Sequence, residues 1–246
     1  MINDFNAIIY AAGNSSRFNN ILKHKCLLKI NSKELIVHQI EWILKFNPKN
    51  LVIVLGDTHK EIKSILESTF GKNKMTFVYN LESKKGNMLS LWSAKDFCND
   101  NCLLTTSDLI VDRLNVENFM QDNQQNKVLI DTKSKEIFSD YDPVKISSNG
   151  KLITKFHKNL DRLDNVNGIS IGVYFFSRLF MSKIISKINQ NLTNNLDDIS
   201  LYKVFNQCIH VEKIVIHKMI NNLWADIDDI DDYNNFINYK LPSFSR

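Results

Sequence analysis

The stretch Asn6-Ala-Ile-Ile-Tyr-Ala-Ala-Gly13 decides the fold, because it is an apolar run of strand length that stops at a glycine. A polar loop follows as Asn14-Ser-Ser-Arg-Phe18, and an apolar pattern resumes at Lys25-Cys-Leu-Leu28. Gly13 permits close approach of the backbone to a ligand, since it has no Cβ that would collide. Backbone N–H groups and serine hydroxyls can bond phosphate oxygens, and an arginine and a lysine can neutralise their charge. The stretch therefore predicts a buried strand that ends in a phosphate-binding loop.

The segments that follow alternate between helical and strand patterns. Residues 34–46 repeat apolar groups at the i, i+3/i+4 spacing of an amphipathic helix. Continuous apolar runs at 51–55 and 75–79 predict two further strands, and strands that are apolar on both faces belong inside a parallel sheet. This order predicts right-handed crossovers and a doubly wound α/β sheet. Ligands of such sheets bind at the carboxyl ends of the strands.

The rest of the chain predicts an antiparallel insertion in this sheet. Asn149-Gly150 lies inside residues 142–158 and is a strong signal for a hairpin with a type I′ turn. We therefore expect a Rossmann-like mixed sheet with a hairpin inserted at about 140–176, in a single domain spanning 1–246. The other expected elements are strands at 101–108, 127–131, 167–176 and 210–216, two helices within 178–207, and a short tail at 239–246.

Composition and charge exclude several classes of protein. The 246 residues are 43% hydrophobic and 24% charged, as is typical of a soluble globular protein. The net charge of +4 suits a site for polyanionic nucleotides and is too small to indicate nucleic-acid binding. No run approaches the roughly 20 apolar residues that span a bilayer, and no secretion signal opens the sequence. We expect a cytoplasmic protein without a membrane partner, whose cysteines are reduced and mostly buried: Cys26, Cys98, Cys102 and Cys208.

Two linked motifs resemble the signature of the nucleotidyltransferases that couple an NTP to a phosphorylated small molecule. In that family a strand ends in A-A-G-x-[GS]-[ST]-R-[FM], and P-K-x-L follows. Residues 11–18 fit every position of the first motif, and Lys25-Cys-Leu27 fits the second, with His24 where proline is usual. The resemblance implies a fold of the nucleotide-diphospho-sugar transferase type. It also implies that the nucleotide is bound by the loop residues Ala11, Ala12, Gly13, Asn14, Ser15 and Ser16.

Residues 80–92 resemble a second family segment, which in relatives helps to recognise the base and the ribose. There a strand ends in Asn, and a loop leads to [GN]-N-x-x-S-L at the start of a helix. The matching residues of this chain are Asn80, Gly86, Asn87 and Ser90. A structural alternative for Asn87 is that it caps this helix.

The resemblance also implies a Mg²⁺ site. Asp108 fits the strand-end aspartate that binds the metal beside the α-phosphate, although strand ends often carry an Asp that only caps a turn. Residues 224–229 look like the late motif W-x-[ED]-I-D-[DT], and residues 226 and 228 of an extended strand point the same way. Asp108, Asp226 and Asp228 would then form a hard-oxygen site suited to Mg²⁺. Asp112 is a weaker candidate, and Asp229 is expected to cap the helix that begins near residue 230.

The predicted hairpin resembles the family segment that walls the acceptor side of the site. Lys145 and Lys158 match its two lysines, and each either neutralises the acceptor phosphate or is a solvated surface charge. Choline-phosphate relatives often have Gly-Glu where this chain has Gly168-Ile169, which weighs against choline. A trimethylammonium acceptor would need an aromatic cage. Its candidates are Tyr141, Tyr174 and Trp224, and Trp224 is also expected to bind the acceptor.

Taken together, the resemblance implies a Mg²⁺-dependent cytidylyltransferase that joins CMP from CTP to a small phosphorylated or phosphonate acceptor. Phosphocholine, 2-aminoethylphosphonate and phosphoglutamine are examples of such acceptors, and the products feed bacterial surface polysaccharides. Lys25 would neutralise charge at the α-phosphate, Arg17 would hold the departing pyrophosphate, and Asp108 would complete the catalytic set.

Several alternatives stay open at this point. One is a sugar-1-phosphate nucleotidyltransferase, and another, of a different class, is a non-catalytic nucleotide-binding regulator. The molybdopterin-type branch shares the loop 14–17, but the hairpin and the late acidic motif argue against it. The base, the acceptor and the oligomeric state, which includes the option of a dimer, do not follow from the sequence.

Overall fold

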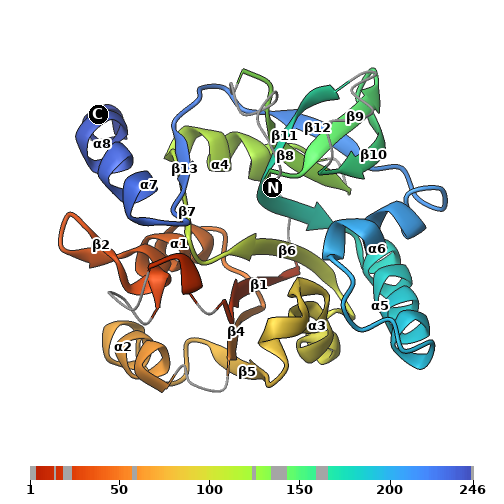
Figure 1. The fold of residues 1–246 in the computed structure, drawn as a ribbon, viewed down its shortest axis with the longest axis horizontal. Coiled ribbons are helices and arrows are strands. Elements are labelled where there is room, and N and C mark those ends of the chain that lie inside the picture. The colour runs from red at the N-terminus through yellow and green to blue at the C-terminus, as the bar shows by residue number, and fades with distance from the viewer. Residues whose placement is uncertain are drawn as a thin grey trace.

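A nine-stranded mixed sheet forms the centre of the molecule (Figure 1). The computed structural model describes residues 4–13, 15–18, 24–56, 60–123, 126–133, 143–158 and 166–244. The order of the strands across the sheet is β5-β4-β1-β6-β11-β8-β12-β10-β9. In chain order their bounds are β1 Phe5–Ala11, β4 Asn50–Gly56, β5 Thr76–Asn80, β6 Asn101–Thr106, β8 Lys127–Asp131, β9 Lys145–Asn149, β10 Leu152–His157, β11 Val166–Phe176 and β12 Val215–Lys218.

Helices and two small ribbons surround the sheet. The ribbons pair β2 (Lys29–Ile30) with β3 (Lys33–Glu34), and β7 (Leu109–Val111) with β13 (Trp224–Asp226). The α-helices are α1 Leu35–Leu44, α2 Lys60–Phe70, α3 Asn87–Ser93, α4 Arg113–Gln121, α5 Arg178–Thr193, α6 Leu201–Cys208, α7 Ile230–Asn235 and α8 Leu241–Phe244. A π-helix at Phe236–Lys240 joins the last two. Among the described residues, no helix combines the length and the apolar character that a bilayer crossing requires.

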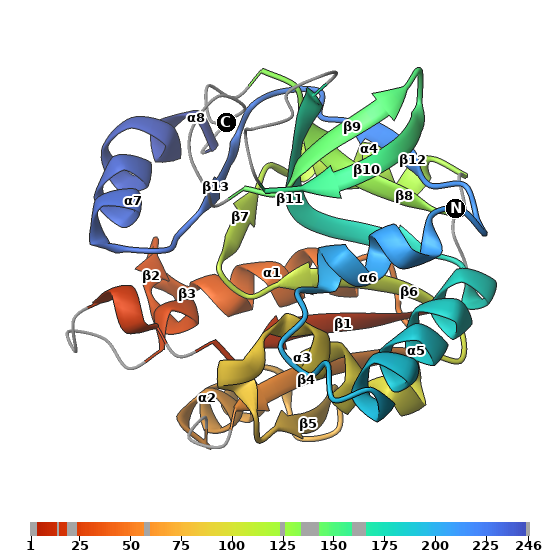
Figure 2. The ribbon, with the colours of Figure 1, turned by 45° about the vertical axis from the view of Figure 1, so that its right-hand side comes forward.

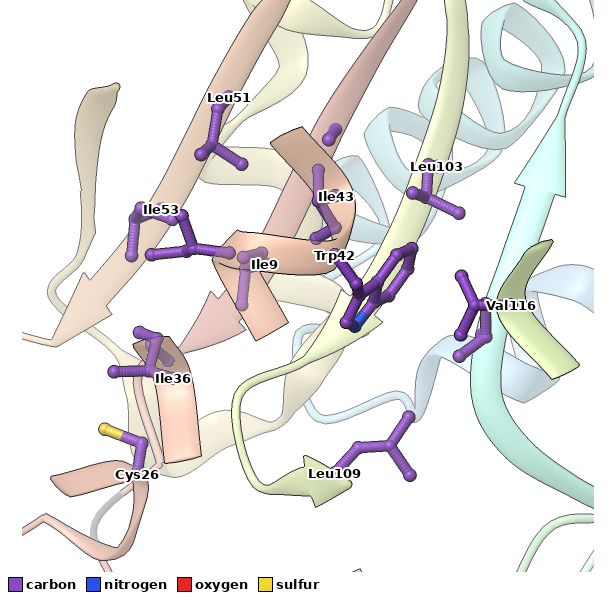
Figure 3. Close-up of a cluster of buried hydrophobic side chains, with 14 of the residues drawn as sticks. Ile9, Cys26, Ile36, Trp42, Ile43, Leu51, Ile53, Leu103, Leu109 and Val116 are labelled. Atoms are coloured by element: carbon purple, nitrogen blue, oxygen red, sulfur yellow. The ribbon is translucent and has the colours of Figure 1, made fainter. Parts of the chain in front are cut away.

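The strand period of two sends alternate residues of β1 into different cores. Ala7 and Ile9 pack with residues of α1, α2 and α4, and Figure 3 shows Ile9 beside Ile36 and Ile43 of α1. Ile8 faces the opposite side, where it packs with residues of α3, α5 and α6. These three helices lie in front of β1 and β6 in Figure 2. The central strands are therefore apolar on both faces because both faces are covered.

Parallel and antiparallel pairings divide the sheet as the sequence predicts. β1 pairs in parallel with β4 and β6, and β4 pairs in parallel with β5. Beyond β6 the long strand β11 runs antiparallel to β6, β8 and β9. The predicted doubly wound mixed sheet with an antiparallel hairpin is confirmed.

The hairpin turn differs from the prediction by one residue. Asn149 pairs with Leu152, so the two loop residues are Gly150 and Lys151. Gly150 has φ +59°, whereas Asn149 is not among the residues with positive φ. A positive φ at the first loop residue alone belongs to a type II′ turn, and the expected type I′ turn over Asn149-Gly150 is wrong.

Two predicted strands and the tail also differ from the structure. The strand expected at 101–108 ends at Thr106, because the chain bends after Ser107 donates its N–H to the Tyr10 carbonyl. The strand expected at 210–216 is β12, which begins at Val215 because the preceding residues turn after α6 and Val215 is the first to pair with β8. The expected tail at 239–246 is helical as far as Phe244.

The C-terminal segment returns to the loop after β1. Phe236, at the start of the π-helix, packs in a small core with Phe18, Ile30 and Ile227, and α7 lies close to β2 in both ribbon views (Figures 1 and 2). This contact closes the molecule around the ends of β1 and β6.

Gly168 on β11 allows the close approach of β8. A methyl group built there would lie 2.6 Å from the carbonyl oxygen of Asp131, on the backbone of β8. We expect Gly168→Ala to lower the free energy of unfolding by about 1–3 kcal/mol, the usual cost of overpacking. Urea denaturation measures this loss.

Gly13→Ala is the matched control, because the same construction at Gly13 meets no atom of the described residues within 4 Å. Its unfolding free energy should stay within about 0.5 kcal/mol of the parent. Equal stabilities of the two variants would contradict the tight packing of β11 on β8.

Candidate active site

Ser15 shapes the loop that follows β1. Its φ of +49° lies in the left-handed region, which a short polar side chain tolerates better than a branched one. The Ser15 carbonyl accepts the N–H of Phe18, and its Oγ accepts the N–H of Lys25 at 2.7 Å. Phe18 is buried in the small C-terminal core. The loop is therefore fixed at both ends, with Arg17 exposed between them.

Lys25 joins two carboxylates that are far apart in the chain. Its Nζ lies 2.5 Å from Asp108 Oδ2 and also pairs with Asp228 Oδ1. Arg17 Nη1 donates to Asp228 Oδ2 at 2.8 Å. Burial disfavours the charged ammonium, but the carboxylates of Asp108, Asp226 and Asp228 outweigh this effect and raise the pKa of Lys25. Lys25 is therefore a permanent cation at this site.

The β7·β13 ribbon brings the acidic residues together. Asp226 pairs with Leu109 across the ribbon, and Ile227 N–H donates to the Asp108 carbonyl at 3.1 Å. Carboxylate oxygens of Asp108, Asp226 and Asp228 then lie within 4.8 Å of one another. Only Asp226 belongs to β13, so the expectation that Asp226 and Asp228 share one strand is wrong. The backbone pairing, rather than a shared strand, creates the cluster.

The acidic cluster contains a carboxylate oxygen that a cation could bind. Asp108 Oδ1 is buried and has no hydrogen-bond partner among the described residues. Asp226 is exposed to the cavity, and the negative charges of Asp108 and Asp228 beside it raise the pKa of its carboxyl. Oxygen ligands of this kind suit a hard divalent cation. The cluster can therefore hold a divalent metal.

The neighbouring aspartates serve as helix caps. Asp229 accepts the N–H groups of Asp231 and Asp232 in a capping box at the start of α7, which confirms its predicted role. Asp112 caps α4 by accepting the N–H of Leu114, and it does not belong to the acidic cluster. These contacts separate the two capping carboxylates from the three that face one another.

A cavity of about 230 Å³ opens beside the loop. Seven predicted nucleotide-binding residues line it: Ala11, Ala12, Gly13, Ser15, Gly86, Asn87 and Ser90. Lys25 and Asp108 line it as well. Asn14 and the side chain of Ser16 lie outside the described residues. Residues that the sequence analysis missed also contribute, namely Tyr10, Cys26, Ser83, Thr106 and Ser107; they adjoin the recognised motifs, which is the signal that could have found them.

Asn80 and Asn87 use their side chains to hold the walls of this cavity. Asn80 is buried, donates to Ser90 Oγ at 3.1 Å and accepts the N–H of Glu82, and it does not line the cavity. Asn87 is the first residue of α3, and its Oδ1 accepts the N–H of Leu201 at the start of α6. The alternative that Asn87 caps its own helix is therefore wrong. Asn87 instead anchors the start of α6 beside this cavity.

A second cavity of about 610 Å³ lies on the other side of the acidic cluster. Arg17, Asp226 and Asp228 line it, together with Lys158 and Trp224, two of the three predicted acceptor-binding residues. Thr106 and Asn87 line both cavities and so mark their junction. The three carboxylates thus stand between two adjoining cavities.

Lys145, the third predicted acceptor residue, does not line the cavity. Its side chain is fully buried, and its Nζ donates to the Lys158 carbonyl at 3.2 Å. Lys145 is therefore neither a solvated surface charge nor a lining residue, and it supports the backbone of Lys158. Of the aromatic candidates, Tyr174 and Trp224 line the cavity, and Tyr141 lies outside the described residues.

Trp224 is held from two sides by residues that the sequence analysis missed. Its Nε1 donates to Asp131 Oδ2 at 2.7 Å, and its carbonyl accepts from Lys240 Nζ at 3.0 Å. Asp131 ends an apolar strand, which is a weak signal for a functional carboxylate. Nothing in the local sequence distinguishes Lys240 from other lysines.

A comparison with family models matches the domain described as "MobA-like NTP transferase domain" to residues 7–146. The match covers more than half of the chain and contains the glycine loop, Lys25, the segment from Asn80 and Asp108. It ends inside β9 and does not reach β13. The match therefore does not include the late acidic motif at 224–229, by which the sequence analysis distinguished between branches of the nucleotidyltransferases.

Among curated proteins, the bifunctional protein GlmU of Francisella tularensis subsp. novicida (strain U112) is 39% identical over 72 residues. These residues are 29% of this chain and 15% of that protein. The match thus spans a small part of the length of this relative.

Solved structures share the fold over nearly the whole chain. The inositol-1-phosphate CTP transferase from T. maritima has a TM-score of 0.78 at 19% identity, covering 97% of this chain and 94% of that one. The CTP:phosphocholine cytidylyltransferase from Streptococcus pneumoniae has a TM-score of 0.77 at 20% identity, with coverages of 96% and 98%. A UDP-glucose pyrophosphorylase bound to UDP-glucose has a TM-score of 0.75 at 17% identity, with coverages of 100% and 99%. The nucleotide-diphospho-sugar transferase fold is confirmed.

The hydrogen bond between Trp224 and Asp131 can be tested by its effect on stability. Trp224→Phe removes the indole N–H and leaves a buried carboxylate oxygen without this donor. We expect the free energy of unfolding to fall by about 1.5–3 kcal/mol, the net contribution of a hydrogen bond to a charged group. Urea denaturation is the measurement.

Trp92→Phe controls for the change in ring size, because no hydrogen bond of the Trp92 indole exists among the described residues. A loss as large as that of Trp224→Phe would mean that the Asp131 contact contributes nothing of its own.

Proposed function

Because this chain belongs to the family of MobA-like NTP transferase domains and is a nucleotidyltransferase, we propose that it is a Mg²⁺-dependent cytidylyltransferase. It transfers CMP from CTP to a small phosphorylated or phosphonate acceptor and releases pyrophosphate. One observation carries the proposal: three carboxylates and Lys25 meet at the junction of a loop-lined cavity and a larger second cavity. Two substrates that react with each other need two adjoining sites of this kind.

The donor set fits Mg²⁺. All three groups are carboxylates, and the buried Asp108 Oδ1 has an unused acceptor position. Mg²⁺ prefers a few carboxylate ligands together with phosphate oxygens and waters. Asp108, Asp226 and Asp228 would hold the ion. When bound, it neutralises the phosphate oxygens near which negative charge develops.

The chain's own residues then align the reactants. An oxygen of the acceptor phosphate attacks the α-phosphorus of CTP, a new P–O bond forms, and the bond to the β-phosphate breaks, so that pyrophosphate leaves with its electron pair. The acceptor supplies the nucleophile, and no covalent enzyme intermediate is required. Lys25 lies at the junction as a permanent cation and neutralises charge at the α-phosphate. Arg17, exposed beside Asp228, holds the departing pyrophosphate.

The two cavities have different roles in this proposal. The loop residues around Gly13 and the segment from Gly86 to Ser90 bind the nucleotide in the smaller cavity. Lys158 and Trp224 belong to the acceptor side in the larger one. Lys145 assists by fixing the Lys158 backbone.

CTP and a phosphorylated alcohol or amine are favoured by the chain's size and by the Asp226-Ile-Asp228 motif. The similar structures that are described as CTP-dependent transferases support this choice, although their identities of 19% and 20% establish only the fold. A sugar-1-phosphate nucleotidyltransferase is the second candidate, because UDP-glucose pyrophosphorylase has a comparable TM-score of 0.75. A non-catalytic regulator is disfavoured by the complete set of Arg17, Lys25 and the three acids.

A screen of pyrophosphate release tests the proposal directly. The purified protein, MgCl₂ and each of the four NTPs are combined with a panel of phosphorylated alcohols, amines and hexose 1-phosphates. We expect turnover with CTP and a non-sugar acceptor. Preference for UTP or GTP with hexose 1-phosphates would establish the second candidate, and nucleotide binding without turnover would point to a regulator.

The acidic cluster is tested by Asp108→Asn and Asp228→Asn. Each removes one negative oxygen that would bind the metal, and we expect turnover to fall by about 100-fold or more. MgCl₂ should raise the melting temperature of the parent and not of the variants, because a ligand stabilises only the state that binds it. Differential scanning fluorimetry and pyrophosphate release are the measurements.

Asp96→Asn is the matched control, since Asp96 is exposed and lines neither cavity of the site. Near-parental turnover in either cluster variant would show that the metal assignment is wrong.

A further inference from the structure

The C-terminal helical segment presents one side to the larger cavity. Asp232, Phe236 and Lys240 all line that cavity at intervals of four residues, and this spacing brings side chains to one face of a helix. Asp232 lies in α7 and Lys240 ends the π-helical turn, so the two side chains reach the cavity from different points of the segment. The segment therefore has an acidic end beside Asp228 and a basic end farther along the cavity.

Lys240 lies in the π-helical turn, and its ammonium makes one hydrogen bond within the described residues. Its Nζ donates to the Trp224 carbonyl at 3.0 Å and lies 5.8 Å from the centre of the Trp224 ring. In the described part of the chain no carboxylate pairs with Lys240. A lysine ammonium has three N–H donors, so two remain available, and its charge is not balanced by a carboxylate. Single π-helical turns are frequent at functional sites, which agrees with such a role.

The ring beneath Lys240 is fixed in position. The hydrogen bond from Trp224 Nε1 to the buried Asp131 prevents the indole from swinging away. A second cation above this ring would meet the charge of Lys240 at close range. The cavity wall at Trp224 is therefore suited to an anion and not to an ammonium group.

We propose that Lys240 binds a carboxylate of the acceptor, at the end of the acceptor away from its phosphate. The inference rests on the proposed function: there the acceptor phosphate reacts at the acidic cluster, and Asp226 is the member of that cluster that lines the larger cavity from β13. Trp224 and Asp226 are two residues apart in β13, which separates their Cα atoms by about 7 Å in a strand. A phosphorylated acid of three or four carbons has this length. The acceptor class is therefore a small phosphorylated carboxylic acid.

A pair of acceptors that differ in one group tests the proposal. 3-Phosphoglycerate carries a carboxylate where glycerol 3-phosphate carries a hydroxymethyl group, and phosphocholine carries a cation. Pyrophosphate release with CTP and MgCl₂ gives kcat/KM for each. We expect the parent protein to prefer 3-phosphoglycerate, and Lys240→Gln to lower its kcat/KM for this acceptor by about tenfold or more, the worth of a charge-assisted hydrogen bond.

Three further measurements distinguish a loss of carboxylate recognition from a general loss of activity. Lys240→Gln should leave the KM for CTP and the kcat/KM for glycerol 3-phosphate within about twofold of the parent, a change well below one hydrogen bond. Lys240→Arg keeps the charge and should retain the preference for the carboxylate. Lys155→Gln removes an exposed lysine on β10 that lines neither of the two cavities of the site, and it should change nothing.

The outcomes distinguish this inference from the proposed function. Turnover of neutral or cationic acceptors that Lys240→Gln leaves unchanged, without any preference for 3-phosphoglycerate, overturns the role of Lys240 and leaves the proposed function standing. A lack of pyrophosphate release with every NTP and acceptor counts against the proposed function. Calorimetric titration of 3-phosphoglycerate into the parent and into Lys240→Gln, with CTP present, then tests whether Lys240 binds the carboxylate. Weaker binding to the variant supports this role of Lys240, and equal binding, or no binding to either protein, overturns it.

Discussion

Mutual repulsion of three carboxylates is the constraint on which the rest of the site depends. Oxygens of Asp108, Asp226 and Asp228 lie within 4.8 Å of one another, and at an effective dielectric constant of about 20 each like-charged pair at this distance costs about 3 kcal/mol. Lys25 and Arg17 offset this cost through their contacts with Asp108 and Asp228. The buried Asp108 Oδ1 still lacks a partner among the described residues. The cluster is held in a state that a divalent cation would complete.

The scaffold maintains this cluster by backbone pairing. β6 brings the chain to Asp108 at the carboxyl end of the parallel strands, and β13 returns to pair with β7 directly after it. The capping box of Asp229 then starts α7 immediately beyond Asp228. Because backbone hydrogen bonds fix both segments, the three aspartates start from neighbouring backbone positions, and a divalent cation would offset the repulsion that Lys25 and Arg17 leave.

The wall of the larger cavity depends on a chain of contacts through Trp224. Asp131 holds the indole N–H, and Lys240 contacts both the carbonyl and the ring. The ammonium of Lys240 lies 5.8 Å from the centre of the Trp224 ring, and its charge disfavours a second ammonium on that face. The same contacts join the edge of the sheet to the C-terminal helical segment, which couples the shape of the cavity to the packing of the last elements.

The sequence by itself determined the alternation of strands and helices and the loop at Gly13, because periodicity and short motifs are local properties. It also singled out Lys25, Asp108, Asp226 and Asp228, which lie together in the structure. It misjudged the hairpin turn and the start of β12, since neighbouring strands decide where pairing begins. Only the tertiary structure decided that Asn87 anchors α6, that Lys145 is buried, and that Asp131 and Lys240 hold Trp224. The bonds of Asn87, Asp131 and Lys240 join different elements, and Lys145 is buried by the packing of others, so no local pattern encodes them.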